Sequence, residues 1–115
     1  MTKIYSVVVD DSNYDLSCIY DIGCFINKGY AEELKHKVER VFYYVEQRSA
    51  KLMIKNPNLY ETDIARRLFN CIKKNPNYKY LAQVQPSYWY SRGPIITIKE
   101  QTLYNDLAEY PKGYN

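Results

Sequence analysis

The stretch NKGYAEELKHKVERVFYYVEQRSAKLMIK, residues 27–55, decides the fold because it carries the clearest periodic pattern in the chain. Its apolar residues recur every three, four or seven positions, which is the spacing of one face of an α-helix. They are Tyr30, Leu34, Val38, Val41, Val45 and Leu52. Asn27 can cap the start of a helix, and Pro57 disfavours helical backbone at Asn56. The pattern predicts one long amphipathic helix over residues 27–55.

A second helix is predicted over residues 59–74. Asn58 and Glu61 have the spacing of an N-cap and the residue that bonds back to it. The apolar stripe of this helix consists of Ile64, Ala65, Leu68, Phe69 and Ile72. The tetrapeptide KNPN occurs at residues 55–58 and again at 74–77. We interpret it as one helix-stop signal used twice, because the flanking residues do not repeat with it.

Strands are predicted on both sides of the helices. Residues 4–9 are β-branched and aromatic, and residues 16–25 are expected to pair back on them, with Gly23 at a bulge or at the strand end. Residues 78–90 and 95–100 are expected to form a second hairpin through the turn SRGP. In the first of these strands, alternation places one set of residues on the face that the helices cover, namely Tyr78, Tyr80, Ala82 and Val84. The order ββααββ predicts an α+β fold. We expect a four-stranded, mostly antiparallel sheet with two helices on one face, in a single domain over residues 1–115.

The composition suits a folded cytoplasmic protein. Hydrophobic residues make up 46% and charged residues 25% of the 115 residues, which is ordinary for a globular domain. Three cysteines without a C-x-x-C pair indicate neither a disulfide framework nor a cysteine metal site. The apolar run near the N-terminus is too short for a secretory signal or a membrane span. We therefore expect a protein without membrane association and without a cofactor.

The stretch SYWYSRGP, residues 87–94, places Tyr88, Trp89 and Tyr90 in a row beside Arg92. Side chains alternate between the two faces of a strand, so these three rings cannot all point into one core. Trp89 faces outward if the register continues through Pro86, and the two tyrosines do so if Pro86 introduces a bulge. Trp, Tyr and Arg dominate binding hot spots, so this stretch is a predicted contact site. Alternatively, the C-terminal tail folds back and covers it.

Basic residues concentrate in the middle of the chain, where residues 27–85 carry twelve Lys or Arg against six Asp or Glu. On the first predicted helix, spacings of three and four align Lys37, Arg40, Tyr44, Arg48 and Lys51. Such a basic ridge can hold a nucleic-acid backbone and stack a base, or dock on an acidic protein surface. The alternative is a solvated helix face, since Glu33, Glu39 and Glu46 lie nearby.

No catalytic or metal signature stands out. His36 is the only histidine, and it lies one helical turn from Glu32, as an exposed surface pair would. DDSNYD begins like a calcium loop, but Leu16 stands where that loop needs Gly, and Ile22 where it needs a bidentate Glu. An enzyme is therefore the least favoured class.

The sequence favours a non-enzymatic interaction protein. The leading hypothesis is a small phage or mobile-element inhibitor that binds a host defence-system protein through the aromatic stretch. The 14 tyrosines suit a contact surface, although an A+T-rich genome would also raise their number. The second hypothesis is a nucleic-acid-binding module that uses the basic ridge, and the third is a protein that sequesters a nucleotide-like small molecule. A homodimer through an exposed edge strand is a further expectation.

Overall fold

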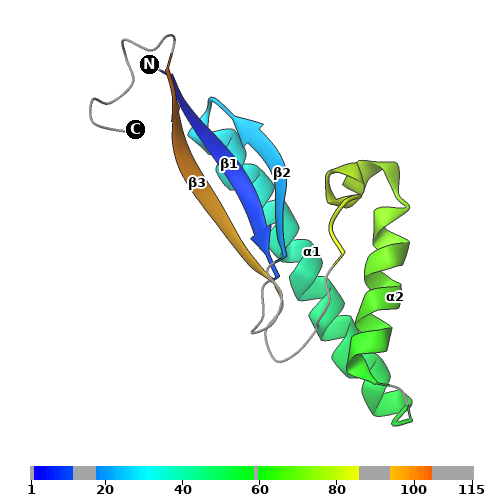
Figure 1. Cartoon of the computed structure of the whole chain (residues 1–115). Helices are drawn as coiled ribbons and strands as arrows, with labels where there is room; N and C mark the ends of the chain where they lie inside the picture. Colours follow the sequence, from blue (N-terminus) through cyan, green and yellow to red (C-terminus); the bar gives the residue numbers. More distant parts are fainter. Residues whose placement is uncertain (1, 12–17, 59, 86–93, 105–115) are drawn as a thin grey trace.

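The computed structural model describes residues 2–11, 18–58, 60–85 and 94–104. Strands β1 (Thr2–Asp10) and β2 (Ile19–Phe25) come first, and helices α1 (Lys28–Lys55) and α2 (Glu61–Lys73) follow. The 3-10 helix η1 (Pro76–Leu81) and strand β3 (Ile95–Leu103) complete the described elements. The three strands form an antiparallel sheet in the order β2-β1-β3 (Figure 1).

Strand β1 is the centre of this sheet, and its valines begin the core. The side chains of Val7 and Val9 are fully buried, as expected for a β-branched run between two paired neighbours. The register with β2 shifts after Val7, which lies opposite Gly23, so that Val8 lies opposite Asp21. One extra residue of β2 is therefore accommodated next to Gly23. The predicted first hairpin and its bulge are confirmed.

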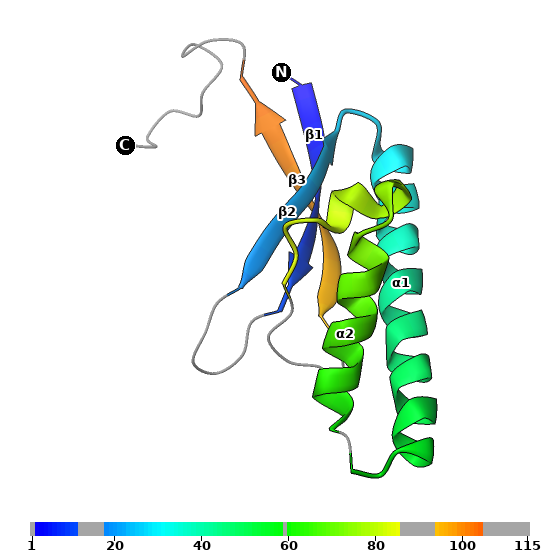
Figure 2. The same cartoon turned by 90° about the vertical axis from the view of Figure 1, so that its right-hand side faces the viewer.

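Helix α1 covers one face of the sheet, and α2 lies on the same side (Figure 2). Helix α1 contacts all three strands, whereas α2 packs against α1 and η1. Val38, Val41 and Val45 of the predicted stripe are buried, but Tyr30 is 60% exposed. Phe42 was not part of that stripe, yet it is buried and stacks on Phe69 of α2, with ring centroids 5.4 Å apart. This stacked pair joins the two helices.

The helix boundaries follow local signals. The Asn27 side chain accepts a hydrogen bond from the Gly29 backbone N–H at 2.7 Å, which confirms the predicted N-cap. At the other end of α1, the Asn56 side-chain amide donates to the Leu52 carbonyl at 3.1 Å. Helix α2 begins later than predicted, and its N-cap is Tyr60 rather than Asn58. Both helices end where a KNPN tetrapeptide begins, as predicted.

The predicted strand over residues 78–90 is wrong, and so is the four-stranded ββααββ sheet. Residues 76–81 form η1, and residues 86–93 lie outside the described residues. The Asn75 side chain accepts from the Asn77 backbone N–H at 3.0 Å, and Pro76 occupies the first turn, where its fixed φ suits a helix. These two residues start a tight helical turn in place of an extended segment. Strand β3 pairs with β1 instead of with a preceding hairpin partner.

Strands β2 and β3 form the two edges of the described sheet, so a homodimer through an edge strand stays a prediction. Within the described ranges, no helix combines the length and the apolar character that a membrane crossing requires.

Two substitutions test the correction at η1. The alternation of the predicted strand places Ala82 inward and Leu81 outward, whereas in the structure Leu81 is fully buried and Ala82 is exposed. We expect Leu81→Ala to lower the free energy of unfolding by about 2–5 kcal/mol, because it leaves a cavity in the core. Ala82→Gln should change it by less than about 0.5 kcal/mol, as a surface substitution does. Urea denaturation of both variants measures these changes. A larger loss of stability in Ala82→Gln than in Leu81→Ala would instead support the predicted strand.

Candidate functional site

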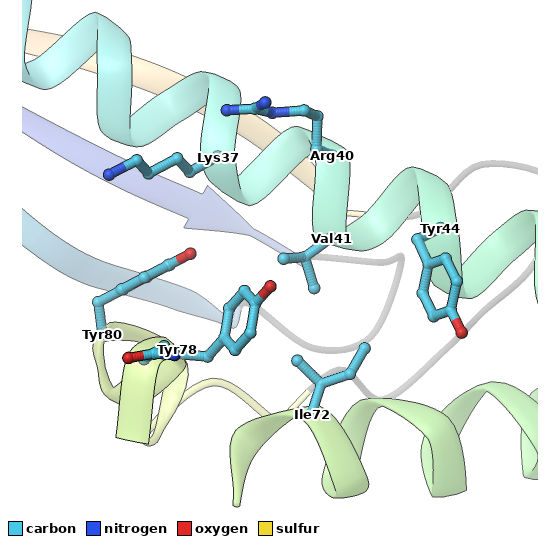
Figure 3. Close-up of a pocket in the computed structure, with 8 residues that line it drawn as sticks. Lys37, Arg40, Val41, Tyr44, Ile72, Tyr78 and Tyr80 are labelled. Carbon is cyan, nitrogen blue, oxygen red and sulfur yellow. The ribbon is translucent and has the colours of Figure 1, made fainter. Parts of the chain in front are cut away.

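A groove with a volume of about 540 Å³ lies between α1 and η1, and we call it the α1–η1 groove (Figure 3). Helix α1 forms one wall, η1 forms the opposite wall, and α2 contributes one residue at the base. The described residues that line the groove are Lys37, Arg40, Val41, Tyr44, Ile72, Asn77, Tyr78 and Tyr80.

The first wall follows from the helical repeat of α1. Residues three or four positions apart are neighbours on a helix surface, so Lys37, Arg40 and Tyr44 lie along one side of α1. Val41 lies next to them at the boundary between the groove and the core, where it is almost completely buried. The helix thus packs on the sheet with its valines and lines the groove with the adjacent polar residues.

The second wall is a pair of tyrosines held by η1. The rings of Tyr78 and Tyr80 contact each other, with centroids 6.2 Å apart and an interplanar angle of 53°. Both rings are partly buried and pack against the core cluster. Figure 3 shows the Tyr78 ring pointing from η1 towards Val41 on α1.

Two hydrogen bonds and two buried residues hold the end of η1 and the segment that follows it. The Lys73 ammonium of α2 donates to the Val84 carbonyl at 2.9 Å, and the Tyr20 hydroxyl of β2 donates to the Gln85 carbonyl at 3.1 Å. Leu81 and Val84 are fully buried. The wall that carries the two tyrosines is therefore attached to α2 and to the sheet, which limits its movement towards α1 or away from it.

The groove is positively charged, since its described lining contains two cations and no carboxylate. Lys37 forms an ion pair with Glu33 one turn earlier, with 3.6 Å between nitrogen and oxygen. Both side chains of that pair are at least half exposed, so the ion pair contributes little to stability. An incoming anion can therefore replace Glu33 as the partner of Lys37. Arg40 has no carboxylate partner within the described part of the chain.

The pKa of Tyr80 is affected by its surroundings in the groove. Burial raises the pKa of its hydroxyl, the neighbouring Tyr78 raises it further, and the Arg40 guanidinium opposes both effects. Tyr80 therefore stays protonated at neutral pH and offers a hydrogen-bond donor. The groove thus combines one neutral donor with two cationic ones.

The two ends of the groove differ in chemistry. In Figure 3, Lys37 and Tyr80 lie towards one end and Tyr44 lies towards the other, with Val41, Tyr78 and Ile72 between them, while the Arg40 side chain extends along α1 on the side away from Ile72. One end can therefore bind a negative charge, and the other offers apolar and aromatic surface to the same ligand.

The structure brings together only part of the predicted basic ridge. Lys37, Arg40 and Tyr44 line the groove, whereas Arg48 and Lys51 lie farther along α1 as exposed residues that do not line it. The predicted aromatic contact site, made of Tyr88, Trp89, Tyr90 and Arg92, lies outside the described residues and stays a prediction.

Sequence reasoning missed the η1 wall because Tyr78 and Tyr80 were interpreted as inward-facing strand residues. Two signals identify the wall in retrospect. Asn75 followed by Pro76 is a helix-start pair, and Leu81 and Val84 are buried three positions apart, which is a helical spacing rather than a strand spacing.

The described lining supplies contacts for binding, and it contains neither a histidine nor a thiol. His36 is exposed on α1, with its Nδ1 atom 3.6 Å from the Glu39 carboxylate. Cys18, Cys24 and Cys71 do not line the groove. Among the residues that the structure describes, no cluster of three or more metal-ligating side chains occurs.

The chain was compared with family models, with curated proteins and with solved structures, and no match was found in any of the three. No residue of the groove therefore takes its role from a relative, and each role follows from the charges, rings and contacts described above.

The proximity of Arg40 and Tyr80 can be measured by titration. We expect Arg40→Gln to raise the pKa of Tyr80 further, because the substitution removes the cation that favours the phenolate. Nuclear magnetic resonance of ¹³Cζ-labelled tyrosine follows the titration, and Tyr80→Phe assigns the signal.

Arg48→Gln is the matched control and should leave the Tyr80 signal unchanged. An unchanged pKa in Arg40→Gln would place Arg40 away from the groove. Because the pKa of Tyr80 is raised on folding, its contribution to stability is fully present at neutral pH. It is lost as the pH rises above the ordinary tyrosine value of 10.0 and through the raised value.

Proposed function

We propose that this protein acts by non-enzymatic binding and that the α1–η1 groove is its binding site for an anionic partner. The observation that supports this proposal is the grouping of Lys37, Arg40 and three tyrosines around one groove, without a carboxylate among its described lining residues. Arg40 has no carboxylate partner among the described residues, and Lys37 has only an exposed ion pair with Glu33, so both cations are available to an incoming anion.

Each part of the groove has a task in this proposal. Arg40 presents a planar guanidinium that can bind two oxygens of one anion, and Lys37 adds a second positive charge. The Tyr80 hydroxyl donates a hydrogen bond beside them. The hydrogen bonds from Lys73 and Tyr20 hold the segment after η1 in place before the partner arrives, so less conformational entropy is lost on binding.

An inhibitor from a phage or mobile element, acting on a host defence-system protein in the cytoplasm, is the second candidate. Ile54 and Tyr60 favour it, because they are 79% and 77% exposed at the end of the helical pair that extends beyond the sheet (Figure 1). Exposed apolar and aromatic side chains are typical contact residues of protein interfaces. The odd number of cysteines and the absence of a C-x-x-C pair suit a reducing compartment.

Affinity capture with charge-matched variants tests the proposal. The tagged protein is incubated with cytosolic lysate, with and without nuclease, and the captured molecules are identified. We expect the double variant Lys37→Glu/Arg40→Glu to lose the partner, because it reverses the charge of the groove. The double variant Arg48→Glu/Lys51→Glu carries the same change of charge outside the groove and should retain it.

Three results contradict the proposed site in different ways. Retention of the partner by the groove variant removes the α1–η1 groove from the binding surface. Equal loss in both variants, together with sensitivity to nuclease, indicates a nucleic acid held along the whole basic ridge. A protein that survives nuclease and ignores both pairs of charges indicates the inhibitor candidate acting through another surface.

A further inference from the structure

We infer that the α1–η1 groove binds a nucleotide unit, with its phosphate at Lys37 and Arg40 and its base against Tyr44 and Tyr78. This inference rests on the proposed function, because it names the ligand class of the same site. A free nucleotide and a unit of a single strand share this chemistry, and the experiment below separates the two sources.

The charged end of the groove suits a phosphate. A phosphate presents several acceptor oxygens close together, and a guanidinium binds two of them in parallel. Lys37, Arg40 and Tyr80 line the groove, and Arg40 lies close enough to Tyr80 to oppose the rise in the pKa of its hydroxyl, so each of the three can donate to a different oxygen. Among the described residues, Glu33 forms an ion pair with Lys37, but that pair is exposed, with 3.6 Å between nitrogen and oxygen.

The other end suits a flat ring. Tyr44 lines the groove and is nevertheless 54% exposed, so its ring is open to a ligand. Tyr78 presents a second ring from the opposite wall, and its contact with Tyr80 holds it in place. Stacking of a base on an aromatic side chain contributes about 1–3 kcal/mol and tolerates any base, since every base has a π face.

Asn77 adds a polar residue to the lining of the groove. Its backbone N–H donates to the Asn75 side chain, and the residue lines the groove. An amide offers both donors and an acceptor, which are the groups that the edge of a base requires.

The dimensions favour a small ligand over a protein surface. The volume of about 540 Å³ falls within the range of roughly 300–1,000 Å³ that is typical of small-molecule sites. Lys37 and Tyr44 are seven residues apart on α1, which corresponds to about 10 Å along the helix axis. This separation suits a ligand that carries its charge at one end and its ring at the other.

Calorimetric titration of the full chain tests the inference. The ligands are the four ribonucleoside 5′-monophosphates, their nucleosides, inorganic phosphate and a six-nucleotide single strand. We expect at least one monophosphate to bind about tenfold or more tightly than its nucleoside and than phosphate alone, because only the monophosphate uses both ends of the groove.

Single substitutions test which end of the groove binds the phosphate and which end binds the base. Arg40→Gln and Tyr44→Ala should each weaken the binding of the monophosphate by about tenfold or more, through loss of a charge-assisted hydrogen bond and of stacking, respectively. The controls are Arg48→Gln and Tyr43→Ala, which make the same changes at exposed positions of α1 that do not line the groove. Both controls should retain the affinity, and circular dichroism verifies that all four variants fold.

The outcomes distinguish a free nucleotide from a single strand. They also distinguish failure of the nucleotide inference from failure of the proposed function. Binding of the single strand at least tenfold more tightly than any monophosphate, with the same loss in the groove variants, supports the inference with a strand as the source. If neither the monophosphates nor the strand bind below about 1 mM, the nucleotide inference is overturned. If Lys37→Glu/Arg40→Glu still loses the captured partner in that case, the groove remains the binding site for another anion; if it does not, the proposed function fails as well.

Discussion

The packing of α1 across the sheet is the interaction on which the rest of the structure depends. Val38, Val41 and Val45 of α1 and Val7 and Val9 of β1 belong to the same buried cluster. Burying a valine side chain stabilises a fold by roughly 1.5 kcal/mol or more, so these contacts outweigh any surface ion pair on the same helix. The same packing fixes the rotation of α1 about its axis and thereby places Lys37, Arg40 and Tyr44 at the groove. Val41 contributes to both regions, so a shift of α1 on the sheet would also change the groove.

The sequence predicts the elements that have strong local periodicity. The long helix, its Asn27 cap, the first hairpin and the bulge beside Gly23 all follow from residue types and spacing. The pairing of β3 does not follow from local patterns, because β3 pairs with β1, which lies far away in the sequence and is not joined to it by a local turn. The fourth strand was predicted from Tyr78, Tyr80, Ala82 and Val84, whose alternation imitates a strand. Asn75 and Pro76 favour a helical turn at the start of that segment, and the local hydrogen bond from the Asn77 N–H prevails over the alternation.

In the candidate site, too, the part that depends on local spacing was predicted and the part that depends on tertiary contacts was not. The α1 wall was predicted as a ridge because helical spacing alone aligns its residues. The η1 wall depends on tertiary contacts, namely the buried side chains of Leu81 and Val84 and the hydrogen bond from Tyr20 to Gln85, which joins residues 65 positions apart. No local pattern encodes such a contact. Sequence reasoning therefore found the cations of the groove and missed the rings that face them, and the proposed function depends on both.

A methyl-aromatic nuclear Overhauser measurement on the free protein tests most directly whether α1 and η1 enclose the groove. The account predicts a cross-peak between the Val41 methyl groups and the Tyr78 ring, because both side chains line the groove from opposite walls. Cross-peaks from the Tyr78 ring to Ile98 of β3, without any to Val41, would indicate a hairpin between residues 78–90 and β3. That result would contradict the account, since it would leave the cations of α1 without the facing tyrosines.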